Sequence, residues 1–392
     1  MKYPLSIILI ILFIVINFLS CSDDPTSIGI DLLEGDFVIV STFDTQDDTV
    51  TQTSSFFKEV VPLGLSSKVL IGKRDELDAT TLMNFAFFIA DSLRQDFLDG
   101  NILVNTAFIE LTPTYTYTDS IAEYDFTVHN ITSVWSILGF TSDSLANLSF
   151  DGEDLSSNKN FTDSIYTFDL NNDFVLQWIK ISIDSSLGKN NGIYIIPTMS
   201  TGKVVGFEAL TITSSDAATF RVVIEKPGSF VDTIRAFIFA DVSAIIAELP
   251  VLTVVDIGVQ ASTTIQSRLF FDVSEVPRDI IINKAELILT EDTLSSITGS
   301  SFNPNLTVFK ITDSSDVTID EGTAIFLIKN NNIYTGDITS FISSWITNED
   351  NQGMVIRPAS LIEGLELFAI RGSEYPELSE RPRLRIVFTS KE

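Results

Sequence analysis

The chain has 392 residues, of which 53 are acidic and 24 basic, so its formal net charge at pH 7 is −29. Nucleic acids are bound by clusters of lysine and arginine, and a chain this acidic is not expected to bind them. One cysteine and one histidine are too few for an intrachain disulfide, a thiolate metal cage or a zinc site built on two imidazoles.

The first 20 residues have the pattern of an export signal. Lys2 precedes an apolar run from Leu5 to Ile16, and Cys21 follows soon after it. A basic start and about a dozen apolar residues are typical of a secretory signal, whereas about 20 apolar residues are needed to cross a bilayer. We expect a lipoprotein signal peptide over residues 1–20 and a lipidated acidic tether over residues 21–36.

The segment that ends in Cys21 resembles a bacterial lipobox. The residues after it, Ser22-Asp23-Asp24, are similar to the acidic start of surface lipoproteins of Bacteroidetes and their relatives. The resemblance implies lipidation of Cys21 and an outer-membrane location, on the cell surface more than on the periplasmic face. A plain signal peptide with an accidental cysteine is the alternative.

The rest of the chain predicts an all-β fold. Short runs rich in Val, Ile, Phe, Thr and Tyr alternate with period two, and Asn, Asp, Gly and Ser clusters of the kind found in turns separate them. Strands are expected, for example, at residues 37–40, 107–111, 220–224 and 384–388. Only Asp169 to Ile181 and Asp337 to Ile346 predict helices, the second because its apolar residues recur at spacings of three and four.

The second half of this β-rich region repeats the first. Equivalent segments follow in the same order: residues 105–111 and 283–289, 127–132 and 307–312, 165–169 and 333–337, 192–197 and 353–358, and 220–223 and 384–387. A repeat of this length indicates duplication of one domain. The turn-prone stretch at residues 226–229 marks the boundary, after which Phe230 takes the place of Phe37. We therefore expect two tandem domains, residues 37–226 and 227–392.

The second repeat, from about residue 251 to 388, resembles the DNRLRE-type β-sandwich domain. The resemblance rests on residues 268–274, 276–277, 282–289, 337–345, 353–356, 372–374 and 382–388. The first repeat is more divergent, with Asn84 in place of Arg268. The resemblance implies two tandem jelly-roll-like β-sandwich domains, each with one short helix, on a secreted or surface protein. It also implies carbohydrate binding, which is described for some relatives, and no reaction.

Aromatic residues are the candidate ligand contacts, because sugar rings stack on them. Trp135 has no counterpart in the second repeat and is a candidate surface aromatic. Tyr115 and Tyr117 alternate along one strand, so they share one face that is either a binding platform or a half-exposed sheet. By contrast, Trp178 and Trp345 occupy the same repeat position on apolar helix faces, which favours a core role.

The remaining candidate groups favour structural roles. His129 is expected to be a solvent-facing strand residue. Acidic stretches at residues 47–48, 151–154, 169–173 and 349–351 fall in expected loops, where their oxygens could hold structural calcium. None has the spacing of an EF-hand, so solvated loops are favoured and no cofactor is expected.

These observations favour a lipid-anchored cell-envelope protein with an adhesive or carbohydrate-binding role and no catalysis. Its expected partners are the membrane, through the lipid anchor, and a polysaccharide or a surface protein. One alternative is a structural spacer or a subunit of a surface protein complex. A second is an acidic glycoside hydrolase, which needs two carboxylates about 5 to 9.5 Å apart in a cleft.

Overall fold

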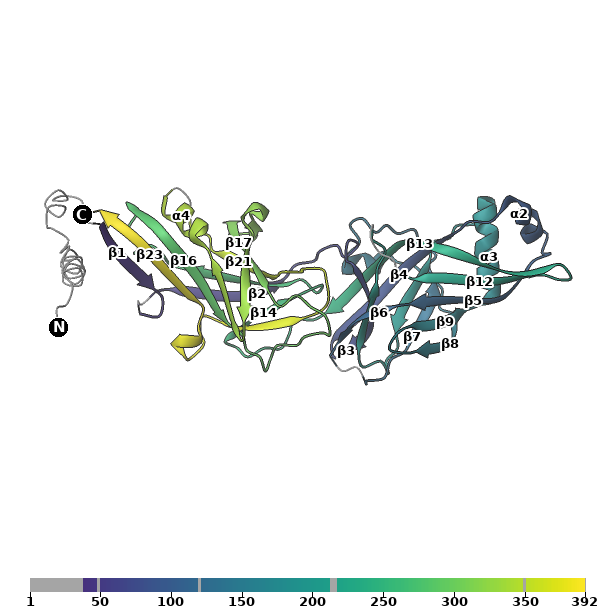
Figure 1. Cartoon of the computed structure of the whole chain (residues 1–392), viewed down its shortest axis with the longest axis horizontal. Helices are drawn as coiled ribbons and strands as arrows, with labels where there is room; N and C mark the ends of the chain where they lie inside the picture. The colour runs from purple at the N-terminus through teal and green to yellow at the C-terminus, as the bar shows by residue number, and fades with distance from the viewer. Residues whose placement is uncertain (1–37, 48–49, 119–120, 212–216, 348–349, 392) are drawn as a thin grey trace, which may run out of the picture.

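The computed structural model describes residues 38–47, 50–118, 121–211, 217–347 and 350–391. These residues are mostly β, with 48% strand and 13% helix, so the predicted all-β class is confirmed. The strands form two large antiparallel sheets, one of 11 and one of 12 strands, which lie end to end (Figure 1). The expected signal peptide, Cys21 and the tether fall outside the described residues. None of the helices described is both long and apolar enough to span a membrane.

The 11-stranded sheet, with the helices packed on it, is named here the first lobe and spans residues 68–247. Its strands are β3 (Lys68–Arg74), β4 (Leu77–Phe87), β5 (Leu103–Leu111), β6 (Pro113–Tyr117), β7 (Phe126–Asn130), β8 (Ser156–Phe161), β9 (Tyr166–Leu170), β10 (Ile193–Pro197), β11 (Val204–Glu208), β12 (Thr219–Lys226) and β13 (Phe230–Ala247). Its helices are α2 (Asp91–Leu98) and α3 (Asn172–Ile183), with short 3-10 turns at Ser142–Asn147 and Ser185–Leu187. Strands β5 and β12 bury alternate residues, as their period-two patterns predict.

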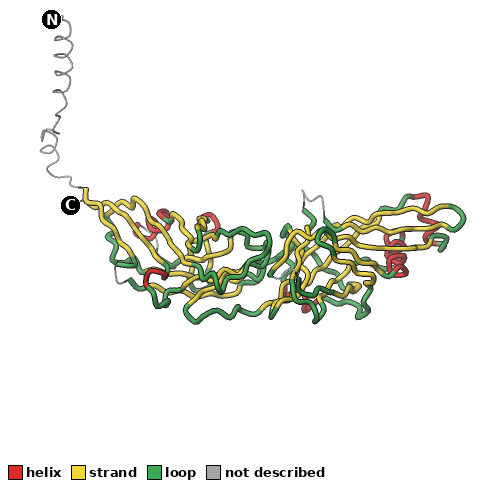
Figure 2. Tube along the Cα trace, turned by 60° about the horizontal axis from the view of Figure 1, so that its bottom comes forward, coloured by secondary structure: helices red, strands yellow, loops and turns green. Residues whose placement is uncertain are grey.

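The 12-stranded sheet and its helix form the second lobe, built from residues 38–58 and 256–391. Its strands are β1 (Val38–Asp44), β2 (Gln52–Lys58), β14 (Asp256–Gln260), β15 (Ile265–Phe271), β16 (Ile280–Thr290), β17 (Leu306–Asp313), β18 (Thr318–Ile319), β19 (Ile325–Asn330), β20 (Ile333–Asp337), β21 (Met354–Pro358), β22 (Leu367–Arg371) and β23 (Arg383–Lys391). It also holds α4 (Thr339–Thr347) and 3-10 turns at Glu321–Thr323 and Leu378–Glu380. Figure 2 shows that strands dominate both lobes and that helices are few.

Strand pairing divides the chain differently from the boundary expected after residue 226. β1 pairs with the C-terminal strand β23, and β2 pairs with β15, so both N-terminal strands belong to the second lobe. β13 pairs with β12 and β4 and belongs to the first. The reason is local: the turn between β12 and β13, where the Ser229 N–H donates to the Lys226 carbonyl at 2.9 Å, folds β13 back onto its own neighbour.

The two long helices occupy equivalent places in the two lobes. α3 follows β9 and packs on β5, and α4 follows β20 and packs on β16. The side chains of Trp178 and Trp345 are 2% and 6% exposed, which confirms the predicted core role of both. The expectation of one helix per domain is wrong for the first lobe, which also has α2. Phe97 is the one buried residue of α2, so its sequence carries little apolar periodicity.

A buried carboxylate on β13 should make the first lobe less stable as pH rises. Burial raises the pKa of Asp241 to about 6, even though a hydrogen bond from the Leu210 N–H, at 2.7 Å, lowers it. The folded state favours the protonated form of Asp241. The contribution of this group to stability is therefore fully present below pH 4 and is lost as pH rises through 6. At about 1.4 kcal/mol per pKa unit, the loss by pH 7 is about 3 kcal/mol.

Replacing Asp241 with asparagine tests this prediction, because the amide keeps an oxygen for the Leu210 N–H. We expect the variant to lose less stability than the wild type between pH 4.5 and 7.5, and to melt above the wild type at pH 7.5. Thermal unfolding followed by circular dichroism measures both. A variant with the pH profile of the wild type would contradict the assignment.

Candidate functional site

The loop after β7 builds a groove around Trp135. The indole Nε1–H donates to the Asn191 carbonyl at 2.6 Å, and the ring meets Phe140 edge to face, with 6.0 Å between ring centroids. These two contacts fix the orientation of a half-buried ring at the edge of a groove of about 270 Å³. The predicted surface aromatic therefore lies at an opening, with its polar edge already bonded.

The rim of this groove combines apolar and polar groups. Val134 and Leu138 are exposed on it. Ser136 also lies on the rim, and its hydroxyl accepts a hydrogen bond from the Leu138 N–H at 3.2 Å. The Asn147 side-chain amide lines the groove and has no hydrogen bond within the described residues. An oriented aromatic ring beside apolar side chains and a free amide suits a ligand with one apolar face and polar edges, such as a sugar ring.

Tyr115 and Tyr117 do not form an open platform. They are 2% and 3% exposed, because the second lobe covers the face of β6 on which they lie. The Tyr115 hydroxyl accepts a hydrogen bond from the Leu365 N–H at 3.0 Å, and a Cβ added at Gly299 would lie 2.2 Å from the Tyr115 ring. The expected binding residues are instead the centre of the contact between the lobes.

Polar contacts surround these tyrosines at the joint. The Ser67 N–H and hydroxyl both donate to the Glu363 carboxylate at 2.6 Å, and the Thr116 N–H donates to the Ser300 hydroxyl at 2.9 Å. Glu366 is buried there. Burial raises the pKa of its carboxyl, and the hydrogen bond with Tyr115 only partly offsets this effect. The joint is therefore a packed interface with directional bonds.

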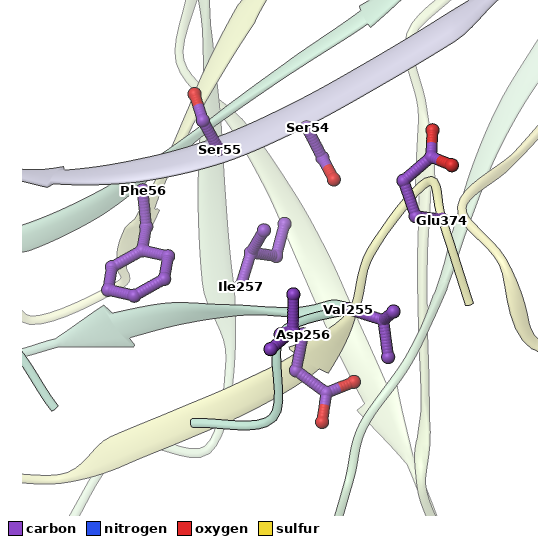
Figure 3. Close-up of a pocket in the computed structure, with 8 residues that line it drawn as sticks. Ser54, Ser55, Phe56, Val255, Asp256, Ile257 and Glu374 are labelled. Atoms are coloured by element: carbon purple, nitrogen blue, oxygen red, sulfur yellow. The ribbon is translucent and has the colours of Figure 1, made fainter. Parts of the chain in front are cut away.

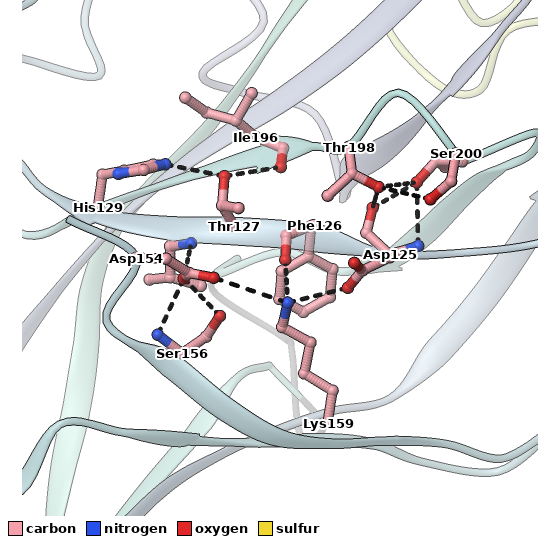
Figure 4. A network of polar contacts seen from close by, with 12 residues as sticks. Asp125, Phe126, Thr127, His129, Asp154, Ser156, Lys159, Ile196, Thr198 and Ser200 are labelled. Atoms are coloured by element: carbon pink, nitrogen blue, oxygen red, sulfur yellow. Dashed lines mark hydrogen bonds and ion pairs between the residues drawn. The ribbon is translucent and has the colours of Figure 1, made fainter. Parts of the chain in front are cut away.

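His129 is buried, which corrects the expected solvent-facing position. It is 8% exposed, and its Nδ1 lies 3.0 Å from the Asp151 carbonyl oxygen. Its Nε2 lies 2.8 Å from the Thr127 hydroxyl (Figure 4). The segment after residue 150 covers the ring and is itself held by Asp154, which accepts a hydrogen bond from the Val128 N–H. A carbonyl and a threonine are the hydrogen-bond partners that the described residues offer His129, and no carboxylate orients it as in a nucleophilic triad.

Figure 4 also shows Lys159, whose side chain carries the positive charge in this region. The Lys159 ammonium lies 2.9 Å from the Asp125 carboxylate and 3.9 Å from that of Asp154. The ammonium also lies 5.3 Å from the centre of the Phe126 ring. The polar network thus ties β8 to β7 and has a structural role.

Two of the acidic stretches predicted in separate loops meet at one cleft. Asp151 and Glu153 face Asn171 and Asp173 across a space of about 330 Å³. The Asn130 amide donates to the Asp151 carboxylate at 2.7 Å. Across the described residues, no three His, Cys, Asp or Glu side chains are grouped to hold a metal ion, so the calcium hypothesis gains no support from this cleft. The stretches at residues 47–48 and 349–351 lie partly outside the described residues.

A second hollow, of about 230 Å³, lies in the second lobe between β2 and β14. Figure 3 shows Ser54 and Phe56 pointing between these strands, while Asp256 points to the other side of β14. There the Asp256 carboxylate lies 3.1 Å from the Arg371 guanidinium. The Ser54 hydroxyl accepts a hydrogen bond from the Ser373 N–H at 2.9 Å. Glu374 and Asp256 both line the hollow; the Glu374 carboxylate is exposed, whereas that of Asp256 is paired with Arg371.

An exposed aromatic face on the first lobe was missed by the sequence analysis. Phe88, Phe237 and Phe239 are all more than half exposed, and the rings of Phe88 and Phe237 meet edge to face at 5.5 Å. The register of β13 on β4 shifts between Ile238 and Ala240, and Phe239 lies at the shift. Alternating aromatics in a strand resemble a core pattern, so nothing in the sequence indicated that these rings would be exposed.

Comparison with known proteins found no match, either among protein-family models or among curated proteins. The resemblance to the DNRLRE-type domain therefore stays a prediction.

Proposed function

We propose that this protein is a lipid-anchored cell-envelope protein that binds carbohydrate through the Trp135 groove. Each lobe is proposed to be a jelly-roll-like sandwich of the DNRLRE type. The observation that carries the proposal is the orientation of the Trp135 ring by its bond to Asn191, at a groove that also offers the free Asn147 amide. A sugar can place its apolar face on the ring and its hydroxyls on the rim.

The position of the N-terminal strand supports display on a surface. β1 begins at the end of the second lobe that is farther from the first lobe (Figure 1). An anchor at Cys21 would place the second lobe next to the membrane and the first lobe, with its groove, farther out. The acidic net charge favours a neutral or basic glycan over an acidic one.

Truncating the groove aromatic should abolish most glycan binding. With the chain from Ser22 on a glycan array, we expect Trp135→Ala to weaken binding of any glycan that the wild type retains by tenfold or more, or about 1.4 kcal/mol. The affinity of Trp135→Phe for the glycan should lie between those of the wild type and Trp135→Ala, since this variant keeps a ring but loses the bond to Asn191. Phe326→Ala is the matched control, because Phe326 is an exposed aromatic of the second lobe. Equal glycan binding by the wild type and Trp135→Ala would exclude this groove, and a blank array for both would favour the spacer or subunit role.

Removing the lipidation site should release the protein from the membrane. Each buried acyl CH₂ contributes about 0.8 kcal/mol, so several chains on Cys21 give stable anchoring. We expect Cys21→Ala to move from the membrane to the soluble fraction of fractionated cells, and Ser22→Ala to stay in the membrane. If Cys21→Ala is processed and retained like the wild type, the protein is not a lipoprotein.

A further inference from the structure

The two sequence repeats exchange their first strands. The first repeat begins with β1 and the second with β13, since Phe37-Val38 corresponds to Phe230-Val231. β1 pairs with β23, the last strand of the second repeat, whereas β13 pairs with β12, the last strand of the first. Each repeat therefore completes the sheet of the other.

β13 shows what role β1 and β2 have in the second lobe. Its first part pairs with β12 and its second part with β4, with the shift of register between them. β1 pairs with β23 and β2 with β15, which are the equivalents of β12 and β4. The pair β1–β2 thus replaces one long strand. The two cases differ in connection, because the turn at residues 226–229 joins β13 to β12 and no short turn joins β1 to β23.

The contacts of this N-terminal segment are extensive and specific. Each strand pairs over seven residues, and Phe43 is buried in the core of the second lobe. The Arg383 guanidinium contacts both oxygens of the buried Asp44 carboxylate, with Nε 2.8 Å from Oδ1, although the two residues are 339 positions apart in the sequence. Because these contacts join the two ends of the chain, the same set can form when a different molecule supplies residues 38–58.

Residues 38–58 are synthesised before the strands with which they pair. Among the described strands, β1 and β2 are synthesised first and β23 last, and the first lobe can fold between them because it is continuous from 68 to 247. Until β23 arrives, β1 has no partner strand, and the Phe43 side chain, which is buried in the folded lobe, stays exposed. The crossover at residues 59–67 is short. Once the chain is complete, the second lobe of the same molecule is therefore present to β1 and β2 at an effective concentration in the millimolar range.

We propose that the second lobe is a strand acceptor for residues 38–58, and that a second copy of this chain can supply them. In such an exchange the crossover at 59–67 bridges two molecules, and each second lobe holds the β1–β2 pair of its neighbour. The first lobe does not exchange, because the turn at 226–229 keeps β13 on its own β12. Strand exchange of this kind makes dimers from contacts that already exist in the monomer.

The test uses two chains from Ser22 on, with different tags, that each carry one half of a thiol pair. One has Thr42→Cys and the other Val387→Cys, at positions that face each other across β1 and β23. The chains are unfolded, mixed, refolded together at increasing concentration and oxidised. Val223→Cys and Thr233→Cys, which face each other across β12 and β13, are the matched control pair. A single chain with both Thr42→Cys and Val387→Cys checks that the two thiols can bond.

We expect a disulfide-linked dimer from the Thr42→Cys and Val387→Cys mixture whose fraction rises with concentration, and none from the control pair. Chains that are folded separately and then mixed should give none. Untagged and tagged wild-type chains should co-purify only after joint refolding, which is a readout that needs no disulfide. Absence of the dimer and of co-purification at every concentration would overturn the proposal, as would an equal dimer fraction from the control pair.

Discussion

Replacing Trp178 with alanine should lower the free energy of unfolding of the first lobe by about 3 to 5 kcal/mol. Its side chain lies beneath α3 and is almost fully buried. The ring contacts Phe174, with 4.7 Å between centroids, and Phe87 and Phe220 at 6.4 and 6.3 Å. Because strands hold two of these neighbours, the cavity left by the truncation cannot collapse. Urea unfolding followed by far-ultraviolet circular dichroism measures the loss.

Trp345→Ala is the matched variant, because Trp345 takes the same place beneath α4. It should lower the stability of the second lobe, identified by limited proteolysis during urea unfolding, and leave that of the first lobe unchanged. Trp178→Ala with wild-type stability and lost glycan binding would make this tryptophan a ligand contact and overturn its core role.

Removing the Arg371 side-chain charge should destabilise the second lobe by about 3 to 5 kcal/mol. The guanidinium lies 3.1 Å from the carboxylates of Asp256 and Asp292, whose side chains are 0% and 7% exposed. Arg371→Met keeps most of the apolar stem but leaves two buried negative charges without a cation. The midpoint of urea unfolding at pH 7 measures the effect. The triple variant Asp256→Asn, Asp292→Asn, Arg371→Met should recover most of the loss, because no buried charge is left unpaired.

The pH dependence of this cluster has a defined sign. Burial raises the pKa of Asp292, but the hydrogen bonds from Ser295 and the Leu294 N–H and the charge of Arg371 outweigh it, so the pKa is lowered overall. Its contribution is therefore present above the ordinary carboxyl pKa of about 3.9 and is lost as pH falls through the lowered value. Below about pH 5 the two carboxylates that Arg371→Met leaves unpaired begin to be protonated. The difference in stability between this variant and the wild type should therefore shrink. If the difference in stability between Arg371→Met and the wild type grows as pH falls, the ion-pair assignment is wrong.

The sequence predicted the fold where the signal was local. Period-two alternation identified the strands, and helical spacing identified α4 and its buried Trp345. Strand partners were not predictable in the same way, because the apolar pattern of β1 fits the edge of either lobe. The turn at residues 226–229 decides the outcome, since it pairs β13 with β12 and leaves β23 to the N-terminal strand.

The candidate site was predictable only in part. The lack of a counterpart for Trp135 in the second repeat pointed to a loop aromatic, and the structure places it at a groove. Alternation showed that Tyr115 and Tyr117 share a face, but it carried no information on what covers that face. The cover comes from Gly299 and Leu365, which are distant in the sequence and belong to the other lobe.

The course of β1 and β2 determines how this molecule would carry tension. The two strands run along the second lobe from the end near the C-terminus to the crossover into the first lobe (Figure 1). A pull between the N-terminal end and the first lobe therefore acts along these strands, and both ladders are loaded in shear, with many hydrogen bonds resisting together. The covalent backbone of residues 38–67 transmits the force directly to the first lobe. The strands of the second lobe lie beside that path, so the lobe can stay folded while the molecule is stretched.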